Sequence, residues 1–277
     1  MHPLIQTMLL TVLAPAAVAG FCVLLASLAA PGRWRSALMA AGIGLAWCVG
    51  VWLTVRAPDW PPKQASDWHF LSVTLATAAT LVAPWWRGTS PWRPFAGLVF
   101  FGTTFALILR RFLTGLWPGA GAWWWPVGSG ALALASAYGV GAVGHYVQAA
   151  VTLAGLVIFT VPVSVVLTLA GAASHGHAAG VFASACGAAW LVSFVLRRQV
   201  DLHPTGWVAA TVLGGILLQG VVFGGARPGA ALLLALAWPM TASVAWLLRR
   251  GAGSWRVAFT VGTLVVCGAG AVWLQVR

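Results

Sequence analysis

Histidine and aspartate supply most of the acid–base and metal-binding chemistry in this sequence, which contains six histidines, three aspartates and no glutamate. Asp67 and His69 are two residues apart, and His175 and His177 flank a single glycine in a segment that we expect to be a loop. Imidazole and carboxylate groups bind Zn²⁺ and related divalent metals. If the two segments meet, these four residues predict a metal site or a proton-accepting cluster. The alternative is that they are solvated loop residues.

Two adjacent arginines, Arg110 and Arg111, form a second candidate site after the apolar run 100–109. If the helix continues to Trp117, both guanidinium groups lie up to two turns inside its end. A cation inside a membrane needs an anion, a carbonyl group or water as a partner, and the planar guanidinium group matches carboxylate and phosphate. The pair therefore predicts an anion-binding site. The alternative is a helix that ends at Leu109, with both side chains reaching the lipid headgroups.

Two prolines and two glutamines complete the set of candidate substrate-binding residues. Pro15 and Pro162 lie inside long apolar runs, where proline kinks a helix and leaves a carbonyl group without its usual partner. Interrupted helices mark the substrate site of many secondary transporters. A carrier would therefore have a central polar cavity reached by Pro15, Pro162, Gln148 or Gln219. The alternative is coincidence, because proline is common in membrane helices.

The amino-acid composition indicates which kind of secondary structure must position these side chains. Of the 277 residues, 61% are hydrophobic and only 6% are charged. A soluble domain carries about 25% charged residues, so soluble enzymes, secreted domains and disordered regulators are excluded. We predict an all-α, polytopic integral membrane helix bundle with no soluble domain. About ten transmembrane helices are expected at 4–30, 36–55, 69–86, 94–113, 124–143, 147–171, 178–196, 206–224, 229–248 and 255–275. Eight or nine spans also fit, because residues 112–196 carry no charge that delimits them.

The net charge of +12 gives the orientation. Lysine and arginine favour the cytoplasmic side of a membrane. With the N-terminus outside, the inner loops hold nine basic residues: Arg33, Arg35, Arg87, Arg93, Arg197, Arg198, Arg249, Arg250 and Arg256. The outer set holds six: Arg56, Lys63, Arg110, Arg111, Arg227 and Arg277. These cations lie singly or in pairs between apolar runs, so we expect contact with a lipid bilayer and none with nucleic acid.

The function expected from these features is that of a multi-pass protein in the inner membrane of a bacterium, with both termini outside. The first interpretation is a carrier of a small neutral or anionic solute, in which 1–143 and 144–277 could be inverted five-helix halves of one domain. The alternatives are a non-catalytic membrane subunit of a larger complex and a metal- or haem-handling membrane protein. Absence of glutamate and of catalytic motifs makes an enzyme the less favoured class, and the sequence identifies no cofactor.

Overall fold

The backbone of the computed structural model forms helices joined by short turns, and the described residues contain no strand. The structure describes residues 9–55, 57–82, 84, 92–116, 119–196, 200–250 and 253–277. Four of the arginines expected in loops lie outside these ranges: Arg56, Arg87, Arg197 and Arg198. The prediction of an all-α membrane bundle is confirmed, because long apolar helices account for most of the described chain.

Each of the ten expected spans corresponds to one α-helix. The helices are α2 (Ala14–Ala29), α3 (Gly32–Thr54), α4 (Ala65–Val82), α5 (Trp92–Ile108), α6 (Trp124–Tyr146), α7 (Ala149–Leu169), α8 (Ala173–Leu196), α9 (His203–Phe223), α10 (Pro228–Leu247) and α11 (Gly253–Val276). Within the described residues, eight helices are long and apolar enough to cross a membrane. The two others, α4 and α5, are 18 and 17 residues long. The result falls within the expected range of eight to ten spans.

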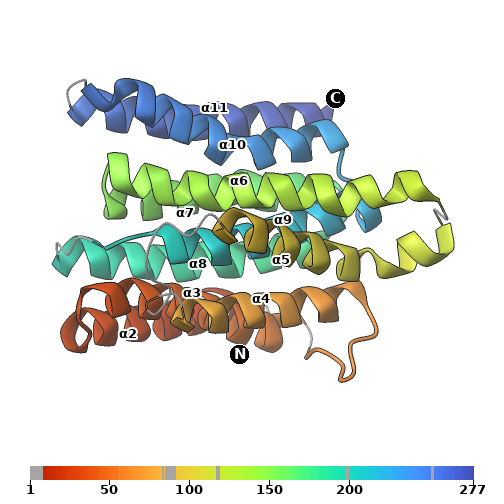
Figure 1. Ribbon diagram of the computed structural model, residues 1–277, viewed down its shortest axis with the longest axis horizontal. Coiled ribbons are helices and arrows are strands. Elements are labelled where there is room, and N and C mark those ends of the chain that lie inside the picture. The colour runs from red at the N-terminus through yellow and green to blue at the C-terminus, as the bar shows by residue number, and fades with distance from the viewer. Residues whose placement is uncertain are drawn as a thin grey trace.

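The helices run along the long axis of the molecule, and α9 lies at their centre (Figure 1). Helix α9 packs against α3, α4, α6 and α8, and it is the most buried of the candidate spans. Helices α2 and α3 pack beside α8 on one side, whereas α10 packs on α6 and α11 packs on α7. A helix that is apolar on every face is expected at such a central position.

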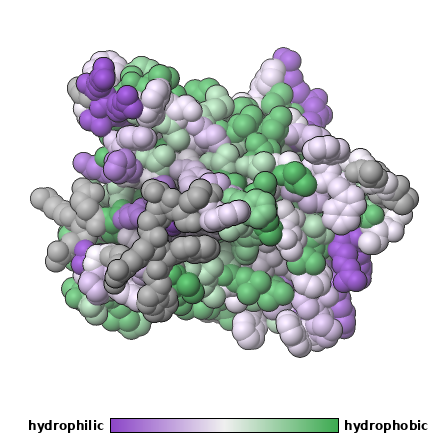
Figure 2. Space-filling view, viewed as in Figure 1, coloured by the Kyte–Doolittle hydropathy of each residue, from purple (hydrophilic) through white to green (hydrophobic). Residues whose placement is uncertain are grey.

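The turns gather at two ends of the bundle. Residues 57–64, 109–116, 170–172 and 224–227 lie at one end, which we call the loop end. The opposite end holds the turns at 30–31, 147–148, 200–202 and 248–250. Figure 2 shows hydrophilic residues toward both ends of the long axis and a hydrophobic surface between them. This distribution is the one expected where hydrocarbon surrounds the middle of a helix bundle and water covers its ends.

The two prolines occupy different helical environments. Pro162 lies inside α7, as expected, whereas Pro15 is in the first turn of α2, directly after a π-helical turn at Leu9–Leu13. Proline lacks the amide hydrogen that a regular helix bonds to the preceding turn, and the turn before Pro15 is π-helical. The expectation that Pro15 lies in mid-helix therefore holds for the continuous helical segment from residue 9 but not for α2 itself.

Candidate functional site

A chain of hydrogen bonds links three of the predicted site residues in the interior of the bundle. The Nδ1 atom of His69 on α4 lies 2.9 Å from Nε2 of Gln219 on α9, and Oε1 of Gln219 lies 3.3 Å from Nε2 of His175 on α8. His69 and Gln219 are only 4% and 2% exposed. His69, Gln219 and His175 were expected in two separate sites, but the fold brings them together in one polar network.

The hydrogen-bond partners determine the direction of this network. The Nε2 atom of His69 lies 3.1 Å from the carbonyl oxygen of Thr211, which can only accept, so Nε2 of His69 donates. The Nδ1 atom of a neutral His69 then accepts from the amide group of Gln219, whose second hydrogen goes to the carbonyl oxygen of Gly215 at 3.2 Å. The Oε1 atom of Gln219 accepts from Nε2 of His175. Each donor in this arrangement therefore has an acceptor, as buried polar groups require.

Two further residues hold the His69 ring in place. Trp47 on α3 packs against it with ring centroids 5.2 Å apart, and the Trp47 indole N–H donates to the carbonyl oxygen of Ala178 at 3.0 Å. Gly215 on α9 also lies against the ring, where a methyl group would overlap the imidazole. The small size of Gly215 therefore allows His69 to approach the α9 backbone closely enough to reach Thr211.

Asp67 and His177 point away from this network, although each is only two residues from one of its members. The expectation that His175 and His177 lie in a loop is wrong, because α8 already begins at Ala173. Residues i and i+2 of a helix are about 200° apart around its axis, so His175 faces the core and His177 is exposed. In the described part of the chain, no group of three His, Cys, Asp or Glu side chains gathers that could hold a metal ion.

Arg110 and Arg111 line a surface groove at the loop end, together with Lys63. The groove has a volume of about 410 Å³ and lies between α4, the residues after α5 and the end of α9. Gln64 and Thr114 add an amide and a hydroxyl group to its wall, and Trp68, Ile108 and Phe223 are among its apolar lining residues. No carboxylate is among the described residues that line it. Three basic residues thus line one hollow that is large enough for a small solute.

The chain around the arginines is helical but irregular. Helix α5 ends at Ile108, and a π-helical turn follows at Phe112–Leu116. The Thr114 hydroxyl donates to the carbonyl oxygen of Arg110 at 2.9 Å, and the rings of Phe112 and Phe223 pack at 5.8 Å between centroids. The sequence left open whether the helix ends at Leu109 or continues past the arginines. In the structure the α-helix ends before the arginines, but helical turns continue after them.

Asp67 positions the third cation through the backbone of the loop before α4. Its carboxylate accepts hydrogen bonds from the backbone N–H groups of Gln64 at 2.8 Å, Lys63 at 3.0 Å and Asp59 at 3.3 Å. Asp67 is 3% exposed and lies in the first turn of α4, where the helix dipole favours a negative charge. Its contacts are therefore those of a residue that fixes the loop carrying Lys63.

The other candidate substrate-binding residues lie outside both the groove and the buried network. Gln148 is exposed at the start of α7, at the opposite end from Gln219. Pro15 lies beside Gly50 on α3, and Pro162 lies against Gly268 on α11. Their contacts are those of residues that pack helices together.

Sequence reasoning did not assign Lys63, Gln64 or Thr114 to a site. Lys63 is the only lysine in the chain and stands in a polar, proline-rich segment, which is a signal that could have drawn attention to it. The contact of Trp47 with His69 has no signature in the sequence. Among known proteins, no protein family model, curated protein or solved structure matches the chain.

Proposed function

We propose that this protein binds a small anionic solute in the groove lined by Lys63, Arg110 and Arg111, and that the groove is the entry site of a membrane carrier. The observation that carries the proposal is the convergence of three cations, from two segments about fifty residues apart, on one hollow whose described lining includes no carboxylate. Guanidinium groups bind carboxylate and phosphate through paired hydrogen bonds. The membrane in question would be a bacterial inner membrane, with the loop end outside.

The buried network supports a carrier because it lies next to the groove. Trp68 lines the groove and His69 joins the network from the same turn of α4, while Phe223 and Gln219 stand one turn apart on α9. A shift of α4 or α9 on solute binding would therefore change the distances between His69, Gln219 and His175.

Anion binding can be tested on the purified full chain at low ionic strength by calorimetric titration with inorganic phosphate, pyrophosphate and succinate. We expect at least one of these anions to bind, and the double variant R110Q/R111Q to weaken its binding at least tenfold. A hydrogen bond to a charged group contributes about 1.5–3 kcal/mol, and about 1.4 kcal/mol corresponds to a tenfold change in affinity. Added salt should weaken binding to the wild-type protein by screening.

The adjacent pair Arg249 and Arg250 provides a matched control at the opposite end of the bundle. The double variant R249Q/R250Q removes the same charge, yet Arg249 lies over the ring of Trp246 at 4.5 Å and neither residue lines the groove. Affinity for the anion should stay unchanged in this variant. An equal loss of anion affinity in both double variants would contradict the assignment of the groove as the binding site. An absence of anion binding to the wild-type protein would contradict it as well.

A second candidate function is that of a non-transporting membrane subunit that binds an anion. The packing of Pro15 against α3 and of Pro162 against α11 favours it, since a carrier was expected to use these kinks at a central cavity. Counterflow of the bound anion in proteoliposomes separates the two functions. Uptake that is lost in R110Q/R111Q supports the carrier, whereas binding without uptake supports the subunit.

A further inference from the structure

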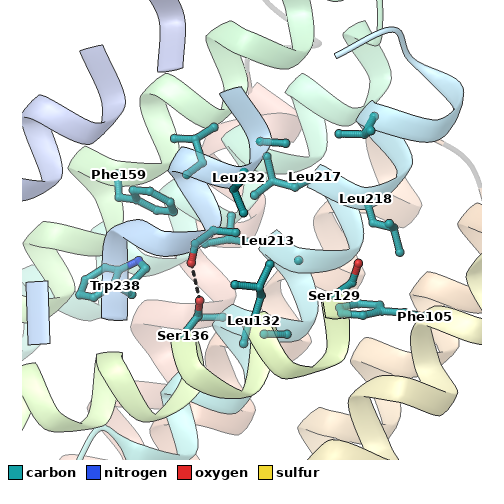
Figure 3. Close-up of a pocket in the computed structure, with 18 of the residues that line it drawn as sticks. Phe105, Ser129, Leu132, Ser136, Phe159, Leu213, Leu217, Leu218, Leu232 and Trp238 are labelled. Carbon is teal, nitrogen blue, oxygen red and sulfur yellow. Dashed lines mark hydrogen bonds between the residues drawn. The ribbon is translucent and has the colours of Figure 1, made fainter. Parts of the chain in front are cut away.

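A second cavity, whose lining shares no residue with that of the groove, lies within the hydrocarbon-spanning part of the bundle. It has a volume of about 150 Å³ and lies between α6, α9 and α10, with Phe159 of α7 and Phe105 of α5 among its lining residues (Figure 3). Leucine, alanine and aromatic side chains make up most of its wall. An apolar protein cavity of about this size stays free of water and binds a single benzene ring. The volume therefore fits one aromatic ring.

One polar group in the wall of this cavity has no partner. The indole Nε1 of Trp238 on α10 makes no hydrogen bond, although Trp238 is only 2% exposed. In Figure 3 the indole nitrogen lies on the side of the ring that faces the other lining residues. Buried N–H groups in proteins almost always have an acceptor. An acceptor supplied by a ligand would complete this site.

The hydroxyl group of Ser136, which also lines the cavity, already donates its hydrogen within the protein. Ser136 on α6 donates to the carbonyl oxygen of Ala235 on α10 at 2.9 Å, which links the two helices across the wall of the cavity (Figure 3). Its hydrogen is therefore already in use. Trp238 remains the donor that a ligand would meet at this depth.

The position of the cavity along the helices indicates a ligand that dissolves in the membrane. Its lining begins near the loop end at Trp125 and Pro228 and extends to Trp238. Pro228 and Trp238 are ten residues apart on one helix, about 15 Å along its axis, or about half of the hydrocarbon thickness. Trp125 and Leu232, which also line the cavity, are 39% and 49% exposed on the surface of the bundle. A ligand would thus enter from the lipid and reach Trp238 near the middle of the bilayer.

We infer that this cavity binds a membrane-dissolved compound consisting of one aromatic ring with a carbonyl oxygen, and that the Trp238 indole N–H donates to that oxygen. Phe159 packs edge-on against Trp238 with ring centroids 6.0 Å apart, and a bound ring would extend this aromatic contact. An aryl ketone has this chemistry. The site requires no anion, so its occupancy is independent of the proposed function.

The test compares two fluorinated probes on the full chain in lipid nanodiscs by ¹⁹F NMR, with empty nanodiscs as the blank. The probes are 4-fluoroacetophenone and 4-fluoro-isopropylbenzene, which have similar shapes and differ in the carbonyl oxygen. We expect the ketone to bind about fivefold more tightly to the wild-type protein, the gain typical of one added neutral hydrogen bond. Equal affinity of both probes, or binding of neither, would overturn the inference.

Three variants locate the site. Trp238→Phe keeps an aromatic ring without the N–H group, so it should remove the preference for the ketone while the hydrocarbon still binds. Ala231→Phe fills the cavity and should abolish binding of both probes, whereas Trp190→Phe on α8, outside the lining, should change neither affinity. A ketone preference that persists in Trp238→Phe contradicts the role of the indole. If Ala231→Phe does not fold, the wild-type comparison and Trp238→Phe still decide between the two outcomes.

Discussion

At the scale of single residues, Gln219 is the group on which the buried network depends. Its amide links His69 to His175, and it uses its oxygen and both of its hydrogens within 3.3 Å of their partners. Reversing the amide would place an N–H group against the N–H of His175. A neutral His69 whose Nε2 donates to Thr211 therefore selects this amide orientation, and a proton gained by His69 at Nδ1 would favour the other.

Replacing Gln219 by leucine should lower the stability of the protein. The substitution removes the Gln219 partner of the buried His69 Nδ1 and of the half-buried His175 Nε2, and an unsatisfied buried group costs about 1–3 kcal/mol. Thermal unfolding in detergent measures the loss. Gln148→Leu is the matched control, because Gln148 is exposed and makes no side-chain cap to α7. Similar melting temperatures for the two variants would show that the network does not stabilise the fold.

At the scale of elements, the loop before α4 connects the core to the groove. Asp67 holds three backbone N–H groups of this loop, and the loop ends directly at the helix that carries His69. The backbone position of Lys63 therefore depends on a buried carboxylate. Because Lys63 is the only lysine, a protease specific for lysine cuts the chain at this loop alone.

Asp67→Asn should make the loop easier to cleave. The amide of asparagine offers one acceptor oxygen where the carboxylate offers two, and it lacks the negative charge that strengthens these bonds. We expect faster cleavage after Lys63 by a lysine-specific protease, measured on the protein in nanodiscs by the rate at which a fragment of 63 residues accumulates. Asp201→Asn, at the opposite end of the bundle, serves as the control. A cleavage rate equal to that of wild type would contradict the role assigned to Asp67.

At the scale of the whole molecule, the sequence was sufficient to predict the bundle. Long apolar runs between charges predict helices by length alone, and even the uncharged stretch 112–196 divides near Gly144 and Gly171, where α6 and α7 end. The boundary of α8 was misplaced because the segment 173–177 is rich in small and polar residues but still helical. Because the helix begins before His175, the side chains of His175 and His177 lie on different faces of α8.

The site was less predictable than the fold because it depends on which helices are neighbours. His69, His175 and Gln219 are separated by more than forty residues along the chain, and no local pattern shows that α4, α8 and α9 meet. The groove likewise joins Lys63 to Arg110 through the packing of α4, α5 and α9. The residue types in the sequence identified several members of the network and the groove, whereas the fold determined which of these residues contact one another.

The orientation of the molecule in the membrane can be measured through the same lysine. The excess of basic residues at the opposite end predicts that the loop end faces away from the cytoplasm. A membrane-impermeant amine reagent should therefore label Lys63 in intact cells that express the chain. Labelling that requires disrupted or inverted membranes would reverse the assignment of the two ends and place the groove on the cytoplasmic side.

Protection of Lys63 by a bound anion tests the central claim most directly. The rate of reductive methylation of Lys63, followed by mass spectrometry on the full chain in detergent, should fall at least threefold when the anion that binds best among phosphate, pyrophosphate and succinate is present. An anion held by Arg110 and Arg111 would contact the ammonium group and shield it. The protection should vanish in R110Q/R111Q and persist in R249Q/R250Q. A methylation rate that the anion leaves unchanged in the wild-type protein would contradict the groove as a binding site.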